Sequence, residues 1–332
     1  MKRKAIYLYP ITADNLPVNG NNYIGNLINE LEKEFVVVNK QPTTLGIIDI
    51  LRKIHKTDII YFNWIEDLPD RRFALLQTFL LMVLLPLSKI LNIKVLWFVH
   101  DNLSHTKRAI RHKKFIAGMM RRRADYIVAH TPNTQYNNLE KFYSFDHPIE
   151  QFNPIAPELP YKYDLLIWGK MLEYKGIAEF VEFHSKKGTN TDLNILIAGA
   201  FPSKEYYERV NNSITPNMTI SNKTIPEDEL RSLFAKSKYI LFTYNSPSVL
   251  SSAALCKTIG WGKEMIGPNI GSFKEFGQKG LIYTYNSLED LEVLLSVLQG
   301  GYVEIKQAEM KVYAERTTWN LFLKFLVNIL KN

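Results

Sequence analysis

The segment YILFTYNSPSVLSSAALCKTIGWGKEMIGPNIGSFKEFG (residues 239–277) decides the fold. It begins with a continuous apolar run, passes through a polar turn into a helical stretch near Ser248 to Ser252, and then repeats the apolar run at residues 264–268. Buried parallel strands are continuous apolar runs, and a crossover helix must join them. The segment therefore predicts a strand–helix–strand unit of a doubly wound α/β sheet.

The same alternation continues on both sides of this segment. Strand-like runs lie at residues 5–10, 35–39, 58–64, 94–100 and 126–131, and again at 163–169, 194–200, 218–222 and 280–284. Residues 152–162 carry three prolines and no apolar periodicity, which is typical of a linker. A chain of 332 residues is long enough for two such domains.

Composition narrows the class of protein. Hydrophobic residues make up 46% of the chain and charged residues 22%, which excludes a disordered or fibrous protein. Cys256 is the lone cysteine, so the chain has no internal disulfide and fits a reducing compartment. No signal-peptide pattern precedes the first strand-like run, and we expect a cytoplasmic protein.

Positive charge is concentrated in one run. Residues 107–123 contain eight Lys or Arg and no acid, within a net charge of +8. A solvated helix face is one explanation, and an anionic membrane surface is the partner that we favour. No helix-turn-helix, RNA-binding or zinc motif accompanies the run, so we expect no nucleic-acid partner.

Residues 73–91 are apolar almost all round the predicted helix. Gln77, Thr78 and Pro86 interrupt the run and Lys89 ends it, so its apolar part is shorter than the roughly 20 residues of a membrane span. Two interpretations stay open: a buried helix, or a helix partly inserted into the membrane interface.

The loops that follow the strands are candidate ligand sites, because open α/β sheets bind ligands at the carboxyl ends of their strands. Gly169 follows one strand, and Lys170 and Lys175 flank the turn before a helix, where they could hold a diphosphate. Gly199 follows another strand, before a helix that begins near Ser203. Surface lysines and turn glycines are common, so each signal is weak alone.

Taken together, these segments resemble the retaining GT-B glycosyltransferases, the family 4-like or group 1 enzymes of bacterial polysaccharide biosynthesis. GKMLEYKG (169–176) looks like their diphosphate loop, and IPEDELRSLFAKSKYILFTY (225–244) looks like the helix and strand that lead into the donor site. LPVNGNNYIGNLINEL (16–31) and KVLWFVHDNLSH (94–105) look like the first loop and the fourth strand of the N-terminal half.

The resemblance implies a domain plan. An N-terminal Rossmann-like acceptor domain spans residues 1–153, and a C-terminal Rossmann-like donor domain spans residues 162–315 across a cleft. The amphipathic segment 316–332 forms a helix that packs back on the N-terminal domain.

The resemblance also implies site residues. His100 contacts the transferred sugar, and Tyr244 and Gly199 border the nucleotide pocket. The donor diphosphate contacts Gly20, Asn21, Asn22, Gly169, Lys170, Lys175, Ser251 and Ser252.

The sequence departs from the family pattern at two points. Many relatives carry two glutamates with seven residues between them, whereas Val249 and Lys257 stand at those positions, which puts the ribose contact in doubt. Lys170 replaces the usual arginine and keeps the charge without bidentate hydrogen bonding. No Asp-x-Asp triplet occurs, so we expect no metal and no other cofactor.

We therefore expect a metal-independent hexosyltransferase-type enzyme that moves a sugar from a nucleoside-diphosphate sugar to a glycan acceptor. The expected acceptor is lipid-linked and belongs to capsule or other cell-surface polysaccharide biosynthesis, and the enzyme is a peripheral protein of the inner membrane face. Retention of anomeric configuration follows from the resemblance alone. Two alternatives stay open: a nucleotide-sugar epimerase on the same fold, and a non-catalytic nucleotide-sugar binding subunit.

Overall fold

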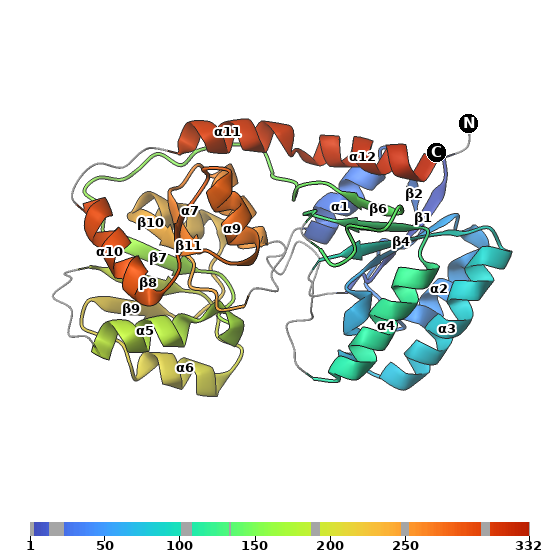
Figure 1. Cartoon of the computed structure of the whole chain (residues 1–332), viewed down its shortest axis with the longest axis horizontal. Coiled ribbons are helices and arrows are strands. Elements are labelled where there is room, and N and C mark those ends of the chain that lie inside the picture. Colours follow the sequence, from blue (N-terminus) through green and yellow to red (C-terminus); the bar gives the residue numbers. More distant parts are fainter. Residues whose placement is uncertain are drawn as a thin grey trace. The chain divides into compact units, whose positions relative to one another are not determined.

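The chain divides into two compact units, each built on one parallel sheet (Figure 1). The computed structural model describes residues 3–12, 23–100, 108–132, 134–186, 193–246, 252–299 and 306–331. Unit 1 comprises Met1–Pro148, Ser248–Ala253 and Thr317–Asn332, and unit 2 comprises Ile149–Pro247 and Ala254–Arg316.

The sheet of unit 1 has the strand order β2-β1-β3-β4-β5-β6. Its strands are β1 (Ala5–Tyr9), β2 (Val36–Val37), β3 (Ile59–Asn63), β4 (Lys94–Val99), β5 (Tyr126–Ala129) and β6 (Phe142–Ser144). All neighbours are parallel, with Tyr7 opposite Ile60 and Tyr61 opposite Leu96. The chain order reverses between β1 and β3, and such a switch point is where ligands bind in open sheets.

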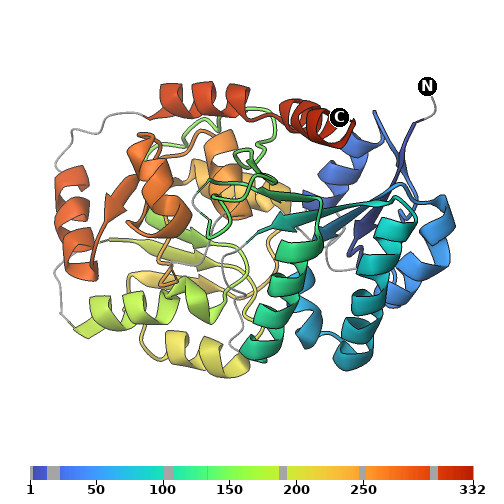
Figure 2. The same cartoon turned by 45° about the vertical axis from the view of Figure 1, so that its right-hand side comes forward.

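Helices cover both faces of this sheet, as Figure 2 shows. They are α1 (Tyr23–Leu31), α2 (Ile47–Lys53), η3 (Ile54–Lys56), η4 (Ile65–Asp70), α3 (Ala74–Ile90), α4 (Ile110–Arg123) and α12 (Trp319–Lys331). Helices α2, α3 and α4 bury apolar side chains with one face of the sheet, and α1 and α12 do so with the other. The C-terminal helix therefore completes the core of unit 1.

The sheet of unit 2 has the order β12-β11-β10-β7-β8-β9, again all parallel. Its strands are β7 (Tyr163–Trp168), β8 (Ile195–Ala198), β9 (Met218–Ser221), β10 (Ser237–Leu241), β11 (Met265–Pro268) and β12 (Tyr283–Tyr285). Numbered from β7, this is the 3-2-1-4-5-6 order of nucleotide-binding Rossmann folds. Its switch point lies between β7 and β10.

The helices of unit 2 also form two layers. They are η5 (Glu173–Lys175), α5 (Ile177–Lys186), α6 (Lys204–Asn211), α7 (Glu227–Ala235), α8 (Ala253–Gly260), α9 (Gly271–Gln278), α10 (Leu288–Gln299) and α11 (Gln307–Arg316). Helices α5, α6 and α10 share one apolar core with the sheet. Ser203 caps α6 by accepting a hydrogen bond from the amide of Tyr206, as its position before the helix predicts.

The predicted α/β fold class is confirmed, and each predicted strand run overlaps a strand of the structure. One strand was missed: β6 has only three residues, lies at the edge of the sheet and is not fully buried, so its sequence shows no apolar run. The helix expected near Ser248 to Ser252 begins, within the described residues, at Ala253. Residues 152–162 form no helix or strand, and the amides of Asn153, Ile155 and Glu158 donate to carbonyls of unit 2.

Candidate functional site

The carboxyl ends of β7 and β8 meet backbone against backbone. Gly169 leaves β7 with a φ of 99°, and a Cβ atom at Gly199 would lie 1.8 Å from the carbonyl oxygen of Gly169. The amide of Gly169 donates to the carbonyl of Ala198, and that of Met171 to Ala200. Glycine is therefore required at Gly199 because no side chain fits between the two loops.

The loop after Gly169 is fastened to the end of β10. Gly176 has a φ of 66°, and a Cβ there would lie 2.3 Å from the carbonyl oxygen of Thr243. The Thr243 hydroxyl donates to the carbonyl of Lys175 at 2.6 Å, and the amide of Asn245 donates to Tyr174. These contacts hold Lys175 at the switch point of the unit 2 sheet.

Lys175 is a buried cation, and no acidic side chain of the described residues pairs with it. Only 7% of the residue is exposed, and its ammonium lies 3.2 Å from the position that a Cβ of Gly169 would take. Within the described residues, its one recorded side-chain contact is the ring of Tyr244, 5.6 Å away. Burying an ammonium without a counter-ion is costly, so this position is suited to an anionic ligand.

Tyr244 forms an aromatic wall beside Lys175. Its ring centroid lies 4.9 Å from that of Phe273 and 5.6 Å from that of Tyr174. Lys175, Gly169, Gly199 and Tyr244 thus come from neighbouring strand ends, as a shared site requires. The Lys170 side chain is exposed, in contrast with Lys175.

Of the other predicted diphosphate contacts, only Ser252 lies within the described residues. Ser252 is buried directly before α8, while Ser251 lies outside the described residues. Gly20, Asn21 and Asn22 also lie outside them. Lys257, at a position where many relatives carry glutamate, pairs with Glu227 at 2.6 Å.

His100 ends β4 and is buried in unit 1. Its Nε2 lies 2.9 Å from Oδ1 of Asn63, and its ring stacks on Trp64 with centroids 4.0 Å apart. Because Nδ2 of Asn63 faces the carbonyl of Tyr9, Oδ1 accepts and Nε2 of His100 donates. Burial, with a smaller effect of His147, holds the pKa of His100 well below its usual value, so the ring is neutral. Its Nδ1 then presents a lone pair.

Two further histidines lie beside His100, and the sequence interpretation missed both. The ring centroids of His130 and His147 are 4.5 Å apart, and that of His130 is 6.0 Å from His100. Nδ1 of His130 faces the carbonyl of Phe145, so Nε2 accepts from the Tyr23 hydroxyl at 3.0 Å. His130 ends a predicted strand as His100 does, and that shared position was the available signal.

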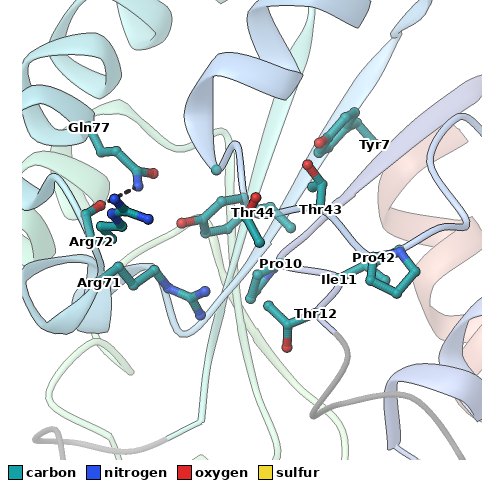
Figure 3. Close-up of a pocket in the computed structure, with 12 residues that line it drawn as sticks. Tyr7, Pro10, Ile11, Thr12, Pro42, Thr43, Thr44, Arg71, Arg72 and Gln77 are labelled. Atoms are coloured by element: carbon teal, nitrogen blue, oxygen red, sulfur yellow. Dashed lines mark hydrogen bonds between the residues drawn. The ribbon is translucent and has the colours of Figure 1, made fainter.

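A cavity of about 380 Å³ lies at the switch point of unit 1 (Figure 3). Figure 3 shows Arg71 directed toward Pro10 and Thr12, with Thr43 and Thr44 above. The full lining is Tyr7, Tyr9, Pro10, Ile11, Thr12, Pro42, Thr43, Thr44, Gly46, Arg71, Arg72 and Gln77. The sequence interpretation did not find this cavity, because its residues come from three separate segments.

Helix α3 is apolar on its outward side. Its exposed apolar side chains are Leu75, Leu76, Phe79, Met82, Val83, Pro86 and Ile90, which we call the outward face of α3, and Lys89 is its exposed cation. Its buried positions include Gln77, Thr78 and Ser88, and Thr78 shares a 2.8 Å hydrogen bond with His112 of α4. The helix is therefore neither wholly buried nor arranged with its polar side toward water.

Helix α4 places cations beside this face. Neither α3 nor α4 contains Asp or Glu. The exposed cations at or next to α4 are Arg108, Arg111, Lys114, Arg121, Arg122 and Arg123. Across the described ranges, no helix is long and apolar enough to cross a membrane.

The described part of the chain contains no group of three or more His, Cys, Asp or Glu side chains that could hold a metal ion. The three clustered histidines are turned toward protein partners, with Nδ1 of His147 on the carbonyl of Pro148 at 2.8 Å.

Comparison with solved structures identifies the fold. HepE of Anabaena, crystallised with UDP and glucose, superposes with a TM-score of 0.72 over all of both chains at 12% identity. Sucrose-phosphate synthase of Thermosynechococcus elongatus gives 0.70 at 11% identity, covering 99% of this chain and 98% of its own. A glycosyltransferase of Rickettsia africae gives 0.67 at 15% identity, covering 100% of this chain and 98% of its own.

The chain has the GT-B fold. No protein-family model and no curated protein sequence matches it. At such low identity the structural likeness establishes the fold alone, so the activity must be argued from the chain's own residues.

Proposed function

We propose that this protein is a glycosyltransferase that moves a sugar from a nucleoside-diphosphate sugar to a glycan acceptor. The observation that carries the proposal is Lys175, a buried ammonium without an acidic partner among the described residues, at the switch point of a sheet with the Rossmann strand order. The departing diphosphate develops negative charge in the transition state, and a fixed cation stabilises it there. HepE was solved with UDP and glucose and with UDP-glucose, which supports a nucleotide-sugar donor.

The remaining roles follow from position. Gly169 and Gly199 let the backbone approach the diphosphate, Lys170 supplies charge from the surface, and Tyr244 bounds the nucleotide. The serines before α8 and the loop of Gly20, Asn21 and Asn22 complete the phosphate contacts. In unit 1, the neutral His100 accepts a hydrogen bond from a hydroxyl of the transferred sugar.

Nucleotide binding tests the proposal directly. Thermal stabilisation by UDP and other nucleoside diphosphates is measured for wild type, Lys175→Met, Lys170→Ala and the double variant. A charge-assisted contact contributes about 1.5–3 kcal/mol, so Lys175→Met weakens binding by at least about tenfold. The exposed Lys170 contributes less, about threefold to fivefold.

Lys204→Ala is the matched control, because Lys204 is an exposed lysine of unit 2 on helix α6. It leaves the nucleotide affinity unchanged. Nucleotide binding with equal affinity by wild type and Lys175→Met would exclude Lys175 as the diphosphate contact. Binding without transfer to any acceptor favours the non-catalytic subunit instead, and epimerisation of free nucleotide-sugar favours the epimerase.

The proposed reaction is metal-independent and retains anomeric configuration. Lys175 and Lys170 supply the positive charge that a divalent cation would otherwise bring to the diphosphate. Transfer rates with EDTA equal to those with magnesium support the first point. The product's anomeric configuration, read by NMR coupling constants, decides the second, and inversion would contradict it.

We propose further that the acceptor is lipid-linked, as in capsule or other polysaccharide biosynthesis, and that unit 1 contacts the inner face of an anionic membrane. The outward face of α3 offers apolar side chains, with Leu75 80% and Phe79 61% exposed. The cations of α4 complement anionic headgroups at about 1 kcal/mol each. An apolar face with flanking cations is the pattern of a helix that lies in the membrane interface.

Vesicle sedimentation tests this contact. Binding to vesicles with phosphatidylglycerol is expected to exceed binding to pure phosphatidylcholine and to fall with salt. Leu75→Ser with Phe79→Ser lowers binding at every salt concentration, and Arg111→Gln with Lys114→Gln reduces the salt dependence. Val293→Ser with Val297→Ser, at exposed valines of α10, is the control. Absence of binding at low salt would exclude the membrane contact.

A further inference from the structure

Contacts between residues of the lining fix the shape of the cavity in unit 1. A Cβ at Gly46 would meet Oε1 of Gln77 at 1.9 Å, and that same oxygen accepts from the amide of Ile47 at 3.2 Å. Nε2 of Gln77 donates to the carbonyl of Arg72 at 2.9 Å, the dashed bond of Figure 3. The amide of Thr43 donates to the carbonyl of Ile11. These bonds join the exits of β1 and β2 to the start of α3.

Two polar atoms of the cavity lining are buried. The Tyr9 hydroxyl and Nε of Arg71 make no hydrogen bond within the described residues. Tyr9 is 2% exposed, and the Arg71 guanidinium lies 5.7 Å from the centre of its ring. Buried polar groups are nearly always hydrogen-bonded, so both donors are suited to a ligand that accepts hydrogen bonds.

The nearby acids are already engaged elsewhere. Asp67 and Asp70 both pair with Lys113. Asp49 accepts from the Tyr7 hydroxyl and pairs with Lys53 at 2.9 Å. Among the described residues no Asp or Glu lines the cavity, and the charged side chains of this lining are Arg71 and Arg72.

Arg71 and the Tyr9 hydroxyl, with the exposed Arg72 also in the lining, favour a phosphate over a carboxylate. A phosphate presents at least three acceptor oxygens in different directions, whereas a carboxylate presents two in one plane. Arginine forms bidentate pairs with phosphate. The three threonines of the lining, Thr12, Thr43 and Thr44, suit the hydroxyls of a sugar. The volume lies in the usual range of ligand pockets.

We infer that this cavity binds a phosphate group carried by the acceptor, through Arg71, Arg72 and the Tyr9 hydroxyl. The inference rests on the proposed function in one respect only, the identification of the ligand as the acceptor. Hydrogen bonds link His100 to this cavity, because its partner Asn63 donates to the backbone carbonyl of Tyr9, a residue of the cavity lining. The phosphate arrives either on a soluble sugar or on a lipid diphosphate.

Direct binding of two phosphate probes tests the inference. Glucose 1-phosphate and farnesyl diphosphate are titrated by calorimetry into the full chain with Lys175→Met, so that phosphate binding at the unit 2 site is suppressed. In the Lys175→Met background, Arg71→Gln weakens the binding of both probes by at least about tenfold, and Arg71→Gln with Arg72→Gln abolishes it. Tyr9→Phe, which removes only the buried hydroxyl, weakens binding by about threefold to tenfold.

Arg52→Gln is the matched control, since Arg52 is an exposed arginine of unit 1 outside the cavity, and it leaves binding unchanged. Tighter binding of farnesyl diphosphate supports a lipid source, and tighter binding of glucose 1-phosphate supports a soluble one. Probe affinities that Arg71→Gln leaves unaltered, or equal binding of glucuronate, overturn the inference. Failure of UDP to bind the wild type overturns the donor site alone.

Discussion

At the residue scale, the three clustered histidines of unit 1 make the protein sensitive to acid. Burial lowers the pKa of His147 to about 4, and it holds those of His100 and His130 well below their usual value. In the unfolded chain each histidine takes up a proton below about pH 6.5. Between the pKa of a histidine in the folded protein and its pKa in the unfolded chain, the unfolded state binds more protons than the folded state. The free energy of unfolding therefore rises with pH in this range and falls as the pH is lowered.

We therefore expect the free energy of unfolding to fall as pH is lowered from about 6.5 toward 4, by up to about 1.4 kcal/mol per pH unit for each histidine. Urea unfolding across this range measures the slope. His147→Gln keeps a polar side chain and reduces the slope, while His55→Gln, at an exposed histidine of unit 1, does not. A slope unchanged by His147→Gln would contradict the assignment.

The same scale shows what the sequence could predict of the sites. Lys175 was named because its loop follows an apolar run, and strand ends are where ligands bind. His100 was named from the family resemblance. The sequence could not distinguish Lys175 from Lys170, because burial of one lysine depends on Thr243, more than 60 residues along the chain. Arg71 was missed for a similar reason: its partners in the cavity come from other strands.

At the element scale, two glycines give opposite expectations. Gly199 lies against the backbone of the Gly169 loop, whereas a Cβ at Gly118, inside α4, would meet no atom within 4 Å. Gly199→Ala must displace the loop, which costs more than about 2 kcal/mol of stability and weakens UDP binding. Gly118→Ala stabilises by about 0.5–1 kcal/mol, because alanine favours the helix.

The urea concentration at the midpoint of unfolding measures the stability change of each variant, provided that the dependence of the unfolding free energy on urea is unchanged. Titration with UDP then distinguishes the two variants by their nucleotide affinity. Gly118→Ala leaves the UDP affinity at its wild-type value, since α4 belongs to unit 1. A Gly199→Ala variant with wild-type stability and affinity would show that the two loops do not pack as closely as described.

Strands were predictable from the sequence where every position along them is buried. The strands of both sheets are buried runs, so apolar letters alone locate them, and β6 was missed because it is short and partly exposed. Helix α3 does not follow the usual amphipathic pattern, because its buried side includes Gln77, Thr78 and Ser88. Gln77 and Ser88 form hydrogen bonds with backbone groups there. Periodicity counts apolar residues and cannot say which side of an apolar helix faces outward.

At the scale of the whole molecule, each unit has its own sheet and its own core. Helix α12 belongs to the core of unit 1, although it follows the last helix of unit 2 in sequence. Phe322 and Leu326 are 1% and 0% exposed there, packed with residues of β1, β3 and β4. Gly169, Lys175, Gly199 and Tyr244 of the proposed donor site belong to unit 2, so the two units are expected to respond to different perturbations.

Scanning calorimetry with and without UDP checks this independence. Phe322→Ala with Leu326→Ala removes buried side chains that each contribute about 2–5 kcal/mol, so the transition of unit 1 moves to lower temperature. UDP raises the transition of unit 2 by mass action in both wild type and variant, because its contacts are intact. Lys324→Ala, at an exposed position of α12, leaves both transitions in place. If the core variant lowered both transitions together and lost UDP binding, the units would have to fold as one cooperative body, and the donor site would depend on unit 1.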